Sequence, residues 1–206
     1  MSTKTLFYCG STTKSFTAAA MSLLVDDNEK FPDVQWNTPI SSLIRDVFVL
    51  SDPWATEHIT VEDALSHRTG YPGHTMGINN SDPRECTRRL RHLPMSAEPR
   101  TVWQYSNYMF TALGHAMEVL TDYEKFVLVP HLPDGRGREG AGMVISNVED
   151  YSRYLDAMLY EKPPISKLGH TALKTPRMLL PLGSVLEELN FYSLGWIGGT
   201  VGGIHQ

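Results

Sequence analysis

The sequence has few cysteines, no long apolar run and no excess of positive charge. Only two cysteines, Cys9 and Cys86, occur among its 206 residues. They are too few for a disulfide framework, which favours reduced thiols in a cytosolic protein. No apolar run approaches the roughly 18 residues that a membrane span needs. The net charge of −5 gives no support for nucleic acid or an anionic membrane as a partner.

Signals for a metal site and for secretion are missing as well. The eight histidines show no paired spacing such as His-x-x-x-His, so the sequence predicts neither a metal nor another cofactor. Residues 1–10 contain one lysine and no long apolar stretch, a pattern unlike a secretory signal. We therefore expect a cytoplasmic protein, and the sequence does not indicate its oligomeric state.

The chain does contain enough apolar residues, 41% of the total, for a single domain with a sizeable core over residues 1–206. Helical spacing dominates from residue 11 to about residue 165. The first helix is expected to follow Ser11 and to end at residues 26–28, with one buried apolar stripe. The residues of this stripe are Phe16, Ala19, Ala20, Leu23 and Leu24.

Further helices are predicted from capping patterns. Capping boxes open at Thr60 and at Ser146, and a second long helix begins near Ser106. The helix after Ser146 carries an apolar stripe formed by Tyr151, Tyr154, Leu155, Met158 and Leu159. From about residue 185 to residue 206, and above all over 191–204, the alternation of apolar residues and glycines is typical of strands and a hairpin. The fold class is therefore predicted to be α+β.

Two short motifs carry candidate chemistry. In Ser11-Thr12-Thr13-Lys14 a serine stands three residues before a lysine at the start of the predicted helix, so the amine can reach the serine oxygen. The helix N-terminus also favours developing negative charge there. Tyr105-Ser106-Asn107 offers a phenolic base and an amide ligand. A serine beside an amine and a phenol indicates acyl transfer.

The segments around these motifs resemble the serine β-lactamase and penicillin-binding protein superfamily, most closely its class C and esterase-like branch. Residues 10–19 are similar to its nucleophile segment, and residues 105–107 to its Tyr-x-Asn motif. Further similar segments follow the family order, Leu65-Ser66-His67-Arg68-Thr69-Gly70, Gly140-Ala141-Gly142-Met143 and Tyr192-Ser193-Leu194-Gly195-Trp196. The resemblance implies a β-lactamase/transpeptidase-like fold, a helical lobe with part of an antiparallel sheet.

The same resemblance implies roles for the motif residues. Ser11 would attack a carbonyl group and form an acyl-enzyme, and Lys14 would ease its deprotonation. Tyr105 would act as a proton shuttle, with a pKa lowered by the adjacent ammonium. Asn107 would bind the substrate carbonyl or orient Lys14, and the Ser11 amide would supply half of an oxyanion hole. The implied substrate is a small ester, amide or lactam.

Each assignment has a plainer alternative. Ser-x-x-Lys is common by chance, Tyr105 fits a core tyrosine, and Asn107 fits a helix N-cap. His67 could be a base or a structural residue of its turn, and we favour the structural interpretation. Cys9 could be mistaken for the nucleophile, but a small buried residue is expected there.

The sequence departs from the family pattern in length and in the third motif. Family members have strands and a helix before the nucleophile, where this chain has ten residues, and a longer segment between residues 126 and 140. The third motif, Lys or His followed by a small residue and glycine, is matched only by His205-Gln206, so His205 is a candidate substrate-binding residue. We expect a domain that is partial at both ends, poorly soluble or oligomeric, and catalytically weak.

Two functions are compatible with these observations. The first is a serine hydrolase or acyltransferase, with an esterase or transesterase favoured over a true β-lactamase. The second is a non-catalytic or degenerate remnant that binds a ligand or partner, or is inactive. The motifs favour the first function and the missing ends favour the second. Analogy at the level of the fold does not choose among the many acyl-transfer reactions of the family.

Overall fold

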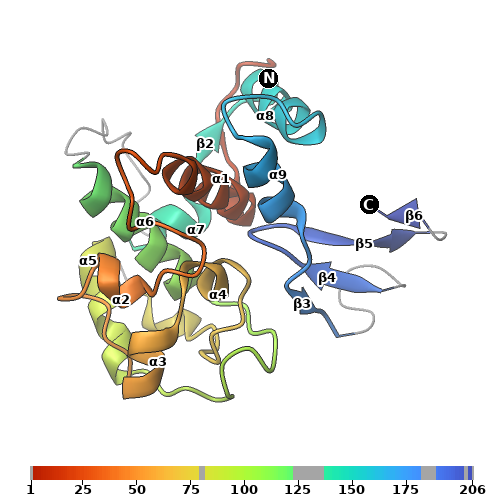
Figure 1. The fold of residues 1–206 in the computed structure, drawn as a ribbon. Coiled ribbons are helices and arrows are strands. Elements are labelled where there is room, and N and C mark those ends of the chain that lie inside the picture. The colour runs from red at the N-terminus through yellow and green to blue at the C-terminus, as the bar shows by residue number, and fades with distance from the viewer. Residues whose placement is uncertain (1, 79–81, 123–136, 182–188, 202–203, 206) are drawn as a thin grey trace.

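A computed structural model describes residues 2–78, 82–122, 137–181, 189–201 and 204–205. Figure 1 shows helices gathered in one lobe and a small antiparallel sheet beside it, as predicted for the α+β class. The α-helices are α1 (Thr13–Asp26), α2 (Ile40–Leu43), α3 (Pro53–His58), α4 (Val61–Leu65), α5 (Pro83–Arg89), α6 (Asn107–Thr121), α7 (Glu139–Gly142), α8 (Val148–Leu159) and α9 (Lys167–Lys174). The 3-10 helices are η1 (Gly10–Thr12), η2 (Thr75–Gly77) and η3 (Leu90–His92). Within these described ranges, no helix has the length and apolar character needed to cross a membrane.

Helix α1 runs through the lobe and is buried around most of its circumference. The predicted helix is confirmed, preceded by η1, but the predicted stripe is wrong at two positions. Ala20 is exposed and Leu23 is 38% exposed, whereas the polar residues Lys14 and Ser22 are buried. The reason is tertiary packing, because α6, α7 and α9 all contact α1 and together cover several of its faces.

The helix starts agree with the capping patterns, with one correction. At α4, Thr60 Oγ1 accepts the Asp63 N–H at 3.2 Å, and Asp63 accepts the Thr60 N–H at 3.1 Å, which confirms the capping box. At α8 the N-cap is Asn147 rather than Ser146, because Asn147 Oδ1 accepts the Asp150 N–H at 3.0 Å. Helix α6 begins within one residue of the predicted position.

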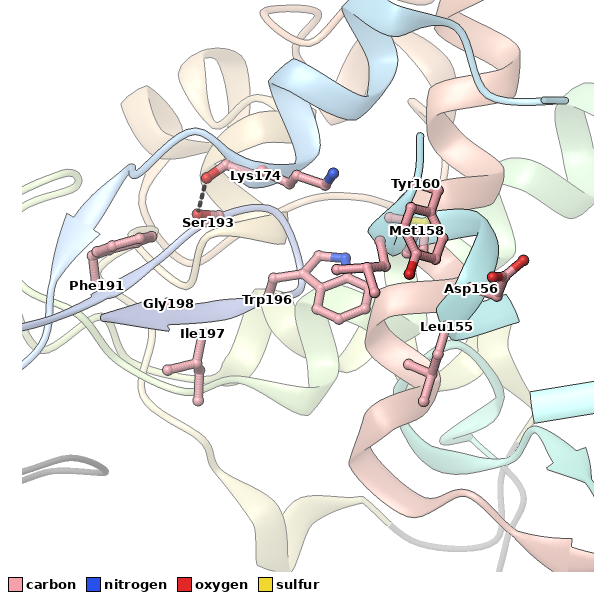
Figure 2. Close-up of a pocket in the computed structure, with 11 residues that line it drawn as sticks. Leu155, Asp156, Met158, Tyr160, Lys174, Phe191, Ser193, Trp196, Ile197 and Gly198 are labelled. Carbon is pink, nitrogen blue, oxygen red and sulfur yellow. Dashed lines mark hydrogen bonds between the residues drawn. The ribbon is translucent and has the colours of Figure 1, made fainter. Parts of the chain in front are cut away.

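The predicted apolar stripe of α8 is only partly buried. Met158 is buried, but Leu155 is 42% exposed and Leu159 is 70% exposed. These residues line an open, mostly apolar cavity of about 840 Å³ between α8 and the sheet. Figure 2 shows the indole of Trp196 pointing from the sheet toward α8, with Ile197 beside it.

The strands form two antiparallel sheets. They are β1 (Phe7–Tyr8), β2 (Ile145–Ser146), β3 (Met178–Leu179), β4 (Asn190–Tyr192), β5 (Ile197–Val201) and β6 (Ile204–His205). Strand β1 pairs with β2, and the other four pair in the order β3-β4-β5-β6. The strands and hairpin predicted over 191–204 are confirmed where described, whereas residues 185–188, 202–203 and 206 of the predicted strand region lie outside the described residues.

The core joins the helices that present the two motifs. Its members include fully buried side chains from α1, α4, α6 and the segment between α2 and α3, among them Met21, Phe48, Leu65, Phe110 and Leu113. Shortening one such side chain costs about 2–5 kcal/mol in comparable cores. This packing fixes the beginning of α1 against the beginning of α6, and so holds Ser11 near Tyr105.

Candidate active site

Ser11 lies in η1, directly before α1, and is exposed. Gly10 precedes it with a φ of +55°, a left-handed conformation that glycine adopts without steric cost. The Tyr105 hydroxyl donates a hydrogen bond to Ser11 Oγ at 2.7 Å. Lys14 Nζ lies 3.4 Å from the same oxygen. The structure therefore brings the predicted serine, lysine and tyrosine together around one oxygen atom.

Lys14 is buried, with 1% of its surface exposed. Its Nζ donates to the carbonyl oxygen of Ala141 at 2.7 Å. The ring centroids of Tyr105 and Phe110 lie 4.6 and 5.4 Å from Nζ, where a ring face attracts a cation. Burial nevertheless disfavours the ammonium and lowers the pKa of Lys14 to about 7. A large share of the neutral amine is therefore present near neutral pH.

The pKa of Tyr105 moves in the direction opposite to the prediction. Burial raises it, and the hydrogen bond to Ser11 offsets only part of that effect. The prediction of a lowered pKa is wrong because desolvation of a phenolate outweighs attraction to the nearby amine. Lys14, with its own pKa near 7, also carries less positive charge than an ordinary lysine. At rest Tyr105 is therefore a phenol that donates a hydrogen bond.

Two glycines allow the backbone to close around Lys14. A Cβ atom at Gly140 would lie 2.3 Å from the carbonyl oxygen of Phe110, so only glycine lets α7 approach α6 and aim the Ala141 carbonyl at Lys14. Gly195, with a φ of +75°, lies on the other side, where a Cβ would be 2.7 Å from the Lys14 carbonyl oxygen.

Asn107 is the first residue of α6 and is half-buried. The N-cap position belongs to Ser106, so the alternative of Asn107 as the helix cap is wrong. No hydrogen bond joins the Asn107 side chain to any other residue that the structure describes. Its amide is therefore available to a substrate.

The structure does not bring His205 to Ser11. His205 pairs with Thr200 of β5, and β5 leads away from the turn at Gly195 that contacts α1. At about 3.4 Å per strand residue, this pair lies roughly 17 Å from Gly195. Figure 1 likewise shows β6 well to the side of α1.

His67, which the sequence offered as a base or as a structural residue, has a structural environment. His67 is fully buried, and burial together with repulsion from Lys14 holds its pKa well below 6.5. This supports the structural interpretation over a base.

Cys9 is half-buried rather than buried. Burial raises the pKa of its thiol, which makes the thiol a weaker nucleophile. The Ala141 carbonyl was missed as a site group. The glycines beside it were its only signal.

The chain belongs to the β-lactamase family, since the family model described as Beta-lactamase matches residues 1–128. Among curated proteins it is similar to Unguisins hydrolase ungD' of Aspergillus campestris, with 37% identity over 241 aligned positions that cover 93% of this chain and 45% of that protein. Unguisins hydrolase ungD of Aspergillus violaceofuscus is 48% identical over 126 residues, which cover 58% of this chain and 22% of that protein. The chain thus spans about half the length of the first relative, and its match covers a smaller share of the second.

Solved structures share the fold. The octameric penicillin-binding protein homologue from Pyrococcus abyssi aligns with a TM-score of 0.75 at 20% identity, covering 96% of this chain and 54% of that one. A D-stereospecific amidohydrolase from Streptomyces aligns with a TM-score of 0.72 at 17% identity, covering 98% and 74%. D-amino acid amidase from Ochrobactrum anthropi, complexed with L-phenylalanine amide, aligns with a TM-score of 0.70 at 20% identity, covering 98% and 68%.

Proposed function

We propose that this chain carries the acylation centre of a serine hydrolase that forms an acyl-enzyme on Ser11. The observation that carries the proposal is the position of Ser11 Oγ, 2.7 Å from the Tyr105 hydroxyl and 3.4 Å from Lys14 Nζ. A serine becomes nucleophilic when a neighbouring base takes its proton, and Lys14, with a pKa of about 7, supplies such a base near neutral pH.

In the proposed acylation, Ser11 Oγ attacks the substrate carbonyl carbon while its proton passes to the neutral amine of Lys14. When the tetrahedral intermediate collapses, the bond to the leaving group breaks. The leaving atom takes a proton from the Tyr105 hydroxyl, which is replaced at the same time from the Lys14 ammonium. Relay through a phenol that never becomes a free phenolate fits the raised pKa of Tyr105. Water then cleaves the acyl-enzyme and returns the proton to Ser11.

Substrate binding is proposed to involve two further groups. The Asn107 amide, at the start of α6 and without another described partner, would hold the substrate carbonyl or its neighbour. The Ser11 N–H would donate to the oxyanion as it develops. His205 remains a candidate binding residue from the sequence alone, and its distance along β5 does not support that role.

The proposed substrate class is a small carboxylic amide or ester. The sequence favoured an esterase or transesterase, whereas the relatives bear names of hydrolases and amidases that act on unguisins or on amino acid amides. We therefore include amides on equal terms with esters. Matched p-nitrophenyl ester and p-nitroanilide substrates, together with a chromogenic cephalosporin, would rank the three carbonyl classes. Product analysis with an added alcohol would separate hydrolysis from acyl transfer.

Labelling with a fluorophosphonate probe tests the central proposal. The wild-type chain should gain one phosphonyl group on Ser11, identified by peptide mass spectrometry, and Ser11→Ala should gain none. Ser15→Ala is a matched control, because Ser15 lies one turn further along α1 and is buried. A cooperatively folded chain that does not react would favour the non-catalytic alternative instead.

A further inference from the structure

A single residue, His67, accepts hydrogen bonds from the residues directly before and after Tyr105 in the chain. The ring nitrogen Nδ1 of His67 accepts the N–H of Ser106 at 3.0 Å. The main-chain carbonyl of His67 accepts the N–H of Gln104 at 2.8 Å. The residues before and after Tyr105 are thus bonded to the same partner, and the His67 and Tyr105 rings lie 4.4 Å apart between centroids.

The His67 ring offers a fixed acceptor. Because Nδ1 accepts a hydrogen bond, the proton of the neutral imidazole must sit on Nε2. Nε2 is buried and has no hydrogen-bond partner in the part of the chain that the structure describes. Instead, the rings of Phe110 and Tyr192 surround the imidazole, at 5.0 and 4.8 Å between centroids. An unpaired buried donor is destabilising, so His67 carries a cost in stability at this position.

The backbone of His67 carries a second cost. Its φ is +57°, a region that residues other than glycine enter with strain and that Asn, Asp and His tolerate best. A glycine would relieve this strain but would offer no side-chain acceptor to Ser106. Backbone strain and an unpaired donor thus occur together at His67. The same residue makes the two hydrogen bonds that hold the segment around Tyr105 in place.

The turn that carries His67 is itself anchored. Asp63 is fully buried and binds Arg68 at 2.6 Å and Arg100 at 2.8 Å. The main-chain N–H of Arg100 also donates to the carbonyl of Arg68 at 2.7 Å. The segment that leads to Tyr105 is therefore tied to the His67 turn at residue 100 and again at residues 104 and 106. Ion pairs and hydrogen bonds therefore connect the Asp63 cluster to the segment that carries Tyr105.

We propose that His67 is a positioning residue of the Ser11 reaction, which holds the Tyr105 hydroxyl at its 2.7 Å distance from Ser11 Oγ by bonding to the residues on both sides of Tyr105. It touches no reacting atom and acts only through Tyr105. This inference rests on the proposed acylation of Ser11 and adds to it the element that orients the proton relay.

Three variants at position 67 separate positioning from stability. His67→Leu introduces an apolar side chain of comparable size and removes the acceptor. His67→Asn places an amide oxygen close to the position of Nδ1 and tolerates the positive φ. His67→Gln stays polar but displaces its acceptor by one bond. The control is His170→Leu in α9, another fully buried histidine, whose Nε2 lies 3.1 Å from the Lys162 carbonyl oxygen.

The readouts are the rate constant for acylation of Ser11 by the p-nitroanilide substrate, split into its binding and reaction parts, and the thermal midpoint. His67→Leu and His67→Gln should slow the reaction part by about 10- to 100-fold, and His67→Asn should stay within about threefold of wild type, because proton transfer by a displaced phenol is impaired and not abolished. Binding of the p-nitroanilide substrate should not change. His170→Leu should lose thermal stability but keep its rate.

The outcomes are distinct. A folded His67→Leu or His67→Gln chain that reacts at the wild-type rate overturns the positioning role. Equal losses in His67→Asn and His67→Leu overturn it as well, because they would reflect packing alone. If His67→Leu does not fold, His67→Gln decides. A wild-type chain that does not react at all overturns the proposed function, and the positioning role falls with it.

Discussion

The Tyr105 hydroxyl reaches Ser11 Oγ at 2.7 Å across 94 residues of sequence. Lys14 approaches the same oxygen from within α1, so one oxygen atom is contacted from two sides by groups of different acidity. Burial shifts the pKa of each group toward its neutral form, lower for the lysine and higher for the tyrosine. Burial therefore favours the uncharged form of both groups while the enzyme is at rest.

Removing the phenolic oxygen should slow acylation without unfolding the chain. Tyr105→Phe is expected to lower the rate of acylation by the p-nitroanilide substrate, whose leaving nitrogen needs the Tyr105 proton, by about 10²–10⁴, the usual range for general acid–base catalysis. Tyr108→Phe is the control, because the Tyr108 hydroxyl is buried without a partner among the described residues. Rates come from the absorbance of the released p-nitroaniline. An unchanged rate in Tyr105→Phe would show that the tyrosine only packs.

Replacing Lys14 should abolish the reaction of Ser11 and raise the unfolding free energy of the chain. Lys14→Met fills nearly the same volume but cannot take a proton, so labelling should disappear. Burial lowers the pKa of Lys14 from 10.5 to about 7, a cost that methionine does not incur. Allowing for the lost bond to Ala141, we expect a gain of about 2 kcal/mol in unfolding free energy at pH 7. Urea denaturation measures it, and a destabilised Lys14→Met would contradict this account.

The same pKa shift sets two pH dependences. Acylation needs the neutral amine, so its rate should rise as pH increases through about 7 and then level off. Because the folded-state pKa lies below the unfolded value, the unfolded chain binds more protons between about pH 7 and 10.5, and Lys14 makes stability rise with pH there. In Lys14→Met this contribution should be absent, which denaturation at several pH values can detect.

Two glycines two residues apart should respond differently to alanine. Gly140→Ala puts a Cβ 2.3 Å from the Phe110 carbonyl, so α7 must move and the Ala141 carbonyl with it. We expect a loss of about 1–3 kcal/mol in stability and slower labelling. Gly142→Ala has no neighbour closer than 3.9 Å and should be nearly neutral in both. Similar values for the two variants would show that close approach at Gly140 is not needed.

The uncovered side of α8 should promote self-association. Leu155 and Leu159 are 42% and 70% exposed beside an apolar cavity, and large exposed apolar patches favour association. The double variant Leu155→Gln, Leu159→Lys should sediment as smaller species and bind less of a hydrophobic dye than wild type. Val119→Lys, which changes an exposed valine on α6, is the control. A wild-type chain that is monomeric at high concentration would contradict this prediction.

The sequence predicted the local parts of this site well. Ser11 and Lys14 lie about one helical turn apart, so their proximity follows from helix geometry once the helix is recognised. The capping box at Thr60 is equally local, and the structure reproduces it. The pairing with Tyr105 is not local and came from family resemblance rather than from spacing.

What the sequence missed depends on tertiary packing. The Ala141 carbonyl belongs to the main chain, which leaves no side-chain signal, and it reaches Lys14 only because Gly140 allows close approach. Periodicity marked the apolar stripe of α8, but it could not show whether another element covers Leu159. The pKa of Tyr105 was predicted in the wrong direction because burial, which outweighs the effect of the neighbouring charge, is invisible in the sequence.

The hydrogen bond between Lys14 and Ala141 closes a loop of 127 residues. Contacts between such distant parts of a chain carry a high entropic cost of closure and tend to form after local helices. During refolding, helicity should therefore return before Lys14 acquires its dry surroundings, and Ser11 should become reactive only when α7 docks. The rate at which Ser11 becomes reactive toward the probe during refolding should therefore report when α7 docks.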